Sequence, residues 1–163
     1  MVAAMEAGGP GFYTVDQTRS AAQYLTVPDD DLIADGTLYV AEIDGQLAGV
    51  GGWSSRRKLF TGSEGQELLR EERLDPSTDA ARIRAFFVSG DFTRRGVARR
   101  LYEACEAAAI EAGFRRLTLM ATLPGVPLYR TLGFSEGQPV EIDLPDGSRL
   151  PCVEMGKQIG PAS

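Results

Sequence analysis

The sequence predicts one mixed α/β domain, because its apolar residues change repeatedly between helical and strand spacing and turn residues separate these segments. A length of 163 residues suits one domain, and 43% hydrophobic with 25% charged residues is the composition of a folded globular protein. Residues 1–12, which are small and include glycine and proline, are expected to form a flexible N-terminus, and residues 13–163 the domain.

Four segments carry helix signals. Thr14 and Gln17 have the form of a capping box, and a run of aspartates from Asp29 places negative charge where a helix begins. A third segment keeps apolar residues on one helical face up to Gly113, and a short fourth one closes at Gly133. The expected helices span residues 14–25, 29–36, 97–112 and 127–132.

Six segments carry strand signals. Asp44-Gly45 lies between two apolar runs and predicts a hairpin, and Pro145-Asp146-Gly147 predicts another. The polar stretch 56–78 is expected to be a long loop. The expected strands span residues 37–43, 46–53, 82–88, 116–121, 140–144 and 150–155.

Charge is distributed unevenly. The net charge is −6, but residues 82–116 hold eight arginines against four acids, which gives this segment +4 and leaves −10 for the remainder. A local basic segment in an acidic chain favours a compact anionic ligand over a nucleic acid, and the acidic remainder favours a cationic partner.

Residue types that are absent exclude whole classes of chemistry. The chain has no histidine and two cysteines, Cys105 and Cys152, which rules out His-based catalytic triads and a Cys/His zinc site, so no metal is expected. No segment has the length and apolarity of a membrane span, and the N-terminus lacks the pattern of a leader. We therefore expect a cytoplasmic protein without a membrane partner.

The segment that follows the expected strand 82–88 has the properties of a phosphate site. A short turn leads into a long helix at Gly96, and the first amides of a helix have no intrahelical acceptors. Gly96 and Ala98 are small enough to let phosphate oxygens approach the backbone, and arginines flank them. Neither a Walker loop nor a Rossmann glycine pattern is present, so the sequence predicts a different kind of diphosphate cradle.

This segment resembles the acetyl-CoA motif of the GCN5-related N-acetyltransferase family, written Gln/Arg-x-x-Gly-x-Gly/Ala. Gly96 and Ala98 match it, while Thr93 stands where the family prefers Gln or Arg. Downstream, the segment 127–134, Pro-Leu-Tyr-Arg-Thr-Leu-Gly-Phe, resembles the family's second signature. The resemblance covers roughly residues 37–157.

The resemblance implies a mostly antiparallel sheet in which two parallel strands splay apart, with acetyl-CoA as co-substrate in the wedge between them. Pantetheine would lie along the first splayed strand, and phosphates would lie on the amides that open the helix. Tyr129 occupies the position of the family's general acid. The implied cofactor-binding residues are Phe86, Phe87, Val88, Thr93, Arg94, Arg95, Gly96, Val97, Ala98 and Arg99.

The N-terminus departs from the family pattern, because no strand is expected before Thr14. The first strand of the family fold is therefore expected to be missing. An exposed sheet edge invites cover by another chain, so a homodimer is one expected form.

The expected activity is direct transfer of acetyl from acetyl-CoA to a primary amine of a small molecule or a protein. The resemblance does not identify the general base that would deprotonate the amine, because Arg82 stands where some family members have a glutamate. The candidates are Glu42, Asp79, Glu141 and Glu154. Two alternatives remain. One is a non-catalytic sensor or regulatory module that binds acyl-CoA, and the weaker one is a nucleic-acid binder that uses the basic patch of residues 94–116.

Overall fold

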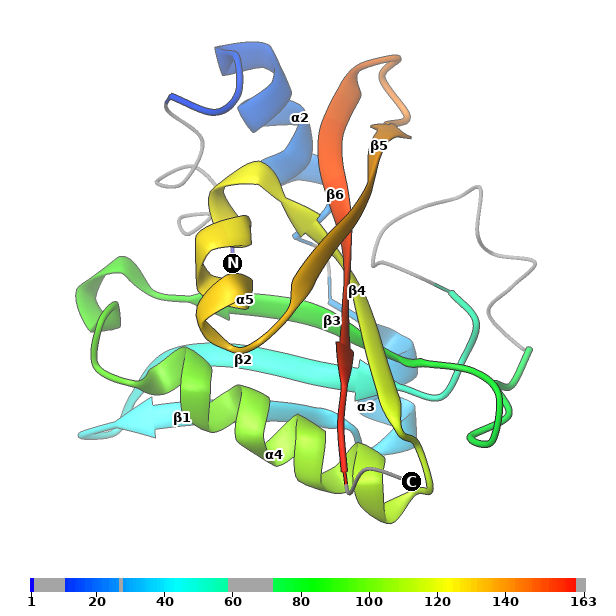
Figure 1. The fold of residues 1–163 in the computed structure, drawn as a ribbon. Coiled ribbons are helices and arrows are strands. Elements are labelled where there is room, and N and C mark those ends of the chain that lie inside the picture. Colours follow the sequence, from blue (N-terminus) through cyan, green and yellow to red (C-terminus); the bar gives the residue numbers. More distant parts are fainter. Residues whose placement is uncertain (2–10, 27, 59–71, 161–163) are drawn as a thin grey trace.

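The computed structural model describes residues 1, 11–26, 28–58 and 72–160, and Figure 1 shows their arrangement. The helices are α2 (Val15–Tyr24), α3 (Asp30–Asp35), α4 (Val97–Glu111) and α5 (Val126–Thr131), with short 3-10 turns at Gly90–Phe92 and Leu123–Gly125. The strands are β1 (Leu38–Ile43), β2 (Gln46–Ser54), β3 (Ala81–Val88), β4 (Arg116–Thr122), β5 (Ser135–Asp143) and β6 (Arg149–Gln158). Every element expected from the sequence is therefore present.

The strands form one six-stranded sheet in the order β1-β2-β3-β4-β6-β5. All neighbouring strands are antiparallel except β3 and β4, which are parallel. This confirms the mixed α/β class and the mostly antiparallel sheet with one parallel pair. Within the described ranges no strand precedes α2, so β1 forms an edge of the sheet, as expected.

The core lies on both faces of the sheet. On one face, α4 and α5 cover β2, β3 and β4, and Cys105, Phe114, Leu117 and Leu119 are buried there. On the other face α2 packs against β5 and β6, where Leu150 and Cys152 are buried (Figure 1). Residues that alternate along a strand thus divide between two cores.

Local signals explain where the helices begin and end. Thr14 accepts a hydrogen bond from the backbone N–H of Gln17 at 3.1 Å and its own N–H donates to the Gln17 side chain at 3.0 Å, which is the expected capping box. Gly36 ends α3 at φ 72°, a left-handed conformation that a side chain would strain.

The boundaries of the last two strands differ from the expectation. β5 begins at Ser135 and not at residue 140, and β6 continues to Gln158 and not to 155. The first part of β5 is polar and carries a register shift between Glu136 and Pro139, so it lacks the alternation that marks a strand in the sequence. Pairing with β6 imposes its extended conformation. The two 3-10 turns were also not predicted.

Backbone hydrogen bonds join the two ends of the long polar loop. The backbone N–H of Arg57 donates to Glu72 O at 2.9 Å, and that of Leu74 donates to Ser55 O at 2.7 Å. Residues 59–71 of the expected loop and 2–10 of the expected flexible N-terminus lie outside the described residues. None of the helices in the described ranges combines the length and apolarity that a bilayer crossing requires.

Candidate active site

The parallel strands β3 and β4 separate almost as soon as they begin. They pair at two positions, Ala81 with Leu117 and Arg82 with Thr118, and not beyond. From there to Val88, the β3 edge that faces β4 is free of strand pairing. We call this opening, between residues 83–88 of β3 and 119–122 of β4, the wedge. A free strand edge offers backbone donors and acceptors to an extended ligand.

A bulge bends β3 at the wedge. The β2–β3 register shifts between Val50 and Gly52, and Ala85 has φ 59°, a conformation rare for a residue with a side chain. Phe86 then packs with the core under α4 and α5, whereas Phe87 packs with the core on the opposite face. The bulge is not predictable from the sequence, because nothing in the residue pattern distinguishes Ala85 from an ordinary strand residue.

The start of α4 presents open backbone amides. Gly96 caps the helix at φ 78° without a side-chain hydrogen bond, no acid lies in the first turn, and the first N–H paired inside the helix is that of Arg100, which donates to Gly96 O at 3.0 Å. A Cβ placed on Gly96 would have nothing within 4 Å, so the space above the turn is open. The amides of Val97, Ala98 and Arg99 and the helix dipole suit an anion here.

The side chains around this turn have different surroundings. Thr93 donates from its hydroxyl to Gly90 O at 3.1 Å, and the guanidinium of Arg95 lies 5.5 Å from the ring centre of Phe92. Arg99 reaches Thr131 O of α5 at 3.4 Å, and Val97 is buried in the core. Arg94 has φ 62°, which turns the chain sharply before Gly96. The residues predicted from the sequence therefore gather at the wedge and at the start of α4.

Tyr129 crosses the open side of the wedge. It comes from α5, and its ring packs edge-on against Phe86 of β3, with centroids 6.4 Å apart, and against Phe134 at 5.9 Å. Within the described ranges its hydroxyl has no hydrogen-bond partner. Burial raises the pKa of this phenol above its usual value, so Tyr129 stays protonated over the neutral and moderately alkaline range.

A cleft of about 470 Å³ lies where β3 and β4 begin, beside their last paired residues. Arg82, Thr118 and Glu154 line it together with Asp79. The neighbours of Arg82, Thr118 and Glu154 along their strands are in or packed against the core with α4, so these three side chains share the opposite face of the sheet. We call this cavity the polar cleft. The sequence did not predict it, because its walls come from three strands.

Two of the four carboxylates considered as bases lie in the polar cleft. Asp79 accepts a hydrogen bond from the N–H of Asp75 at 2.7 Å and pairs with Arg57 at 3.6 Å. Glu154 is half-buried and has no hydrogen bond or ion pair within the described ranges. Glu42 is exposed on edge strand β1, and Glu141 is exposed and pairs with Arg149 at 3.6 Å. Glu154 is therefore the uncommitted carboxylate nearest the wedge.

The cysteines belong to the two cores. Both Cys105 and Cys152 are buried and free, and burial raises the pKa of each thiol to about 12. A thiol with such a pKa is a poor nucleophile at neutral pH. In the described part of the chain, no group of three or more acids and cysteines is arranged to hold a metal ion.

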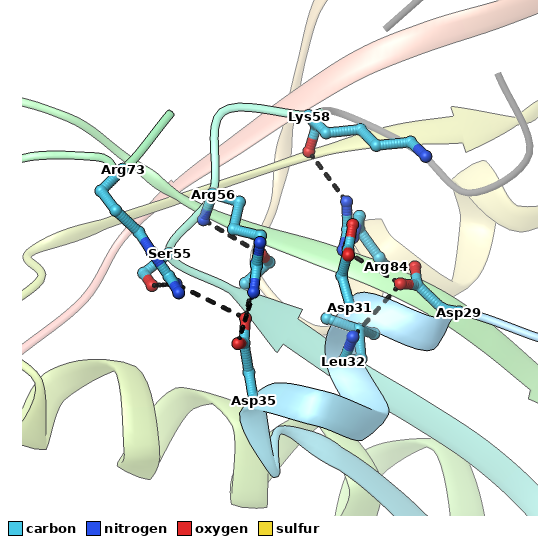
Figure 2. A network of polar contacts seen from close by, with 10 residues as sticks. Asp29, Asp31, Leu32, Asp35, Ser55, Arg56, Lys58, Arg73 and Arg84 are labelled. Atoms are coloured by element: carbon cyan, nitrogen blue, oxygen red, sulfur yellow. Dashed lines mark hydrogen bonds and ion pairs between the residues drawn. The ribbon is translucent and has the colours of Figure 1, made fainter. Parts of the chain in front are cut away.

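A network of arginines and aspartates joins α3 to the sheet (Figure 2). Arg84 of β3 is buried and contacts Asp29 at 3.1 Å and Asp31 at 3.9 Å. Arg56 binds Asp35 with two hydrogen bonds, of 2.8 and 2.7 Å, and Arg73 contacts the same carboxylate at 3.5 Å. Burial lowers the pKa of Arg84, and its aspartate partners oppose this shift. Arg84 is thus a structural cation.

Replacement of Arg84 by methionine is expected to lower the free energy of unfolding by about 3–5 kcal/mol, because it removes the guanidinium that faces two buried carboxylates. Chemical denaturation measures the change. Arg149→Met, at an exposed arginine of β6, serves as the control and is expected to change stability by less than about 1 kcal/mol. A loss for Arg84→Met as small as that of the control contradicts the structural role.

Asp35 is expected to make stability pH-dependent. The hydrogen bonds from Arg56 hold the pKa of Asp35 below its usual value, so its contribution is complete above about pH 4, the usual carboxyl pKa, and is lost as the pH falls through the lower folded value. The difference in unfolding free energy between wild type and Asp35→Asn should therefore stay constant from about pH 7 to about pH 4 and shrink as the pH falls further. Denaturation at several pH values measures it, with Asp44→Asn in the exposed β1–β2 turn as control. If the difference in unfolding free energy stays the same below about pH 4, the proposed role of Asp35 is contradicted.

The comparisons with known proteins agree with this geometry. A family model described as the acetyltransferase (GNAT) family matches residues 10–134. No curated protein matches the chain at a significant level.

Several solved structures share the fold. A GCN5-related N-acetyltransferase from Rhodopseudomonas palustris is 19% identical, with a TM-score of 0.70 over 97% of this chain and 84% of that one. PaiA N-acetyltransferase from Thermoplasma acidophilum, solved in complex with coenzyme A, is 12% identical, with a TM-score of 0.64 over 97% and 87% of the chains. The ribosomal-protein-S18-alanine N-acetyltransferase from Escherichia coli is 19% identical, with a TM-score of 0.55 over 92% of each chain.

The family match covers most of the chain, and the sheet with its single parallel pair is the fold of these neighbours. Acetyl transfer is the general activity that this match supports. The chain belongs to the acetyltransferase (GNAT) family.

Proposed function

We propose that this protein transfers an acetyl group from acetyl-CoA directly to a primary amine, with residues 13–163 acting as one domain. The observation that carries the proposal is the position of Tyr129, whose ring reaches from α5 across the wedge to Phe86 of β3 while the amides of α4 open at the end of the same strand. A solved neighbour that binds coenzyme A supports the co-substrate.

The residues of the chain fit acetyl-CoA by their chemistry. The amides of residues 94–99 and the flanking arginines provide donors for a diphosphate, and no acid in the first turn of α4 opposes it. The unpaired edge of β3 from Phe86 to Val88 offers backbone groups to the amides of pantetheine. Acetyl-CoA supplies the thioester that makes the acyl group reactive.

In the proposed reaction Glu154 removes one proton from the acceptor ammonium, directly or through water, so that the nitrogen lone pair becomes free to bond to the acetyl carbon. Tyr129 donates its phenolic proton to the sulfur as the carbon–sulfur bond breaks. The second proton lost by the nitrogen as the amide forms restores the phenol through solvent. Glu154 then releases to solvent the proton that it took from the ammonium, so each turnover releases one proton.

The proposal is tested by measuring free thiol release from acetyl-CoA with a panel of primary amines. Amine-dependent release supports the transferase. Arg82 stands at the cleft where some family members have a base, and this favours a second candidate, a sensor that binds acyl-CoA without turning it over. Tight acetyl-CoA binding with no thiol release for any amine supports the sensor and contradicts the transferase.

We further infer that the protein acts in the cytoplasm, which is supported by two cysteines that are both buried and free. We also propose that the protein forms a homodimer, in which the partner would cover the exposed edge of β1.

A further inference from the structure

The polar cleft brings together Arg82 and Glu154, and neither side chain forms an ion pair with any residue that the structure describes. Arg82 donates from Nη1 to Ala80 O at 3.4 Å, and its buried Nε has no hydrogen-bond partner within the described ranges. Glu154 likewise forms no hydrogen bond or ion pair in that part of the chain, and Arg82 and Glu154 do not pair with each other. Asp79 and Glu154 line the same cleft as Arg82; burial lowers the pKa of Arg82, and these two acids oppose the shift.

The other charged groups around the polar cleft are occupied. Lys157 donates to Tyr102 Oη at 2.6 Å and to Leu132 O at 2.8 Å, and Arg116 donates to Thr78 O. Asp79 is held by Asp75 N–H and Arg57. Arg84, the next arginine on the same face of β3, is held by Asp29 and Asp31 (Figure 2). Among the described charged groups that line the cleft, Arg82, Arg116 and Glu154 form no ion pair. Arg116 is exposed to solvent, whereas Arg82 and Glu154 are half-buried, so these two charges gain most from a ligand.

The strand register orders these two charges relative to the wedge. Arg82 is level with Thr118, where β3 and β4 last pair, and Thr118 is level with Gly156 of β6. Glu154 is level with Met120, two residues further along β4, where the wedge has begun to open. A small ligand with its cationic end at Glu154 and its anionic end at Arg82 would hold the cationic end beside the wedge.

We propose that the amine acceptor is an amino acid, whose ammonium group binds Glu154 and whose carboxylate binds Arg82. A guanidinium binds a carboxylate with two parallel hydrogen bonds, and a half-buried guanidinium with an unused N–H gains most from such a partner. The inference rests on the proposed function for the reaction, but the binding it describes is a separate property. The sequence analysis expected a cationic partner, and this inference adds that the acceptor also carries a carboxylate.

The test compares amino acids with their matched carboxamides as acceptors, by thiol release, in wild type and in Arg82→Gln. The carboxamide also changes the pKa of the amine, so the ratio of kcat/KM for acid over amide is compared between enzymes. We expect this ratio to fall by about tenfold in Arg82→Gln, since a charge-assisted hydrogen bond contributes about 1.5 kcal/mol or more.

Arg19→Gln, at an exposed arginine of α2, is the matched control and should keep the wild-type ratio. Arg82→Lys keeps the charge without the planar pair of donors, so it should retain part of the preference, and it replaces Arg82→Gln if that variant does not fold. Equal ratios in wild type and the Arg82 variants overturn the inference.

Failure of the proposed function has a different signature, namely no thiol release with any acceptor. Calorimetric titration of the amino acids and their amides into the protein with coenzyme A then tests the cleft by itself. Tighter binding of the acids that disappears in the Arg82 variant supports the inference, and equal binding contradicts it.

Discussion

Tyr129→Phe is expected to lower kcat for acetyl transfer by about 100-fold, because general acid catalysis by a positioned side chain contributes about 10²–10⁴-fold. The change removes the phenolic proton and keeps the ring, so the edge-on contacts with Phe86 and Phe134 remain. Binding of acetyl-CoA should change by no more than about threefold, since the hydroxyl is proposed to act as the sulfur departs. Steady-state thiol release and calorimetric titration of acetyl-CoA measure the two effects.

Tyr39→Phe is the matched control, because Tyr39 lies on edge strand β1, two strands away from β3. It should leave kcat unchanged. A kcat for Tyr129→Phe near that of wild type removes Tyr129 from the role of acid. Because burial raises the pKa of Tyr129, its protonated form persists to high pH, so no alkaline decline of kcat below about pH 10 should depend on this residue.

Ala98→Glu is expected to weaken acetyl-CoA binding by about 100-fold, because a carboxylate in the first turn of α4 would oppose the diphosphate, and like charges placed together at an interface cost several kcal/mol. The helix itself should tolerate the change, since an acid near a helix N-terminus interacts favourably with the dipole. Calorimetric titration of acetyl-CoA gives the affinity, and thermal unfolding of the free protein checks the fold.

Ala107→Glu is the matched control for this variant. Ala107 is exposed on the same helix, well beyond the first turn, so the same charge is added away from the open amides. It should bind acetyl-CoA as wild type does. Equal affinities for the two variants contradict the proposed phosphate site at the start of α4.

The helices and hairpins were predictable because their signals are local. The capping box at Thr14, the glycine after α3 and the Asp-Gly turn between β1 and β2 each act over a few residues, and the structure has each where the sequence predicted it. The predicted start of β5 was wrong, because residues 135–139 are polar and adopt an extended conformation only through pairing with β6. Long-range pairing of this kind leaves no periodic signal.

The parts of the candidate site also differ in how far they could be predicted from the sequence. The segment 93–99 and Tyr129 lie in contiguous motifs, so the resemblance to a family pointed to them before the fold was known. The bulge at Ala85 and the polar cleft have no such motif. Arg82 and Glu154 are separated by most of the second half of the chain, and they meet because β4 lies between β3 and β6.

By itself, then, the sequence determined the fold class, the family resemblance and a chemistry without histidine, because composition, periodicity and short motifs are properties of neighbouring residues. Only the tertiary structure decided which charges remain unpaired. Arg82 and Arg84 are nearly identical in sequence context, yet α3 supplies two aspartates to one and none to the other among the described contacts. Neutralisation of a charge depends on the distance to its partners in space, and the order of residues along the chain does not contain that distance.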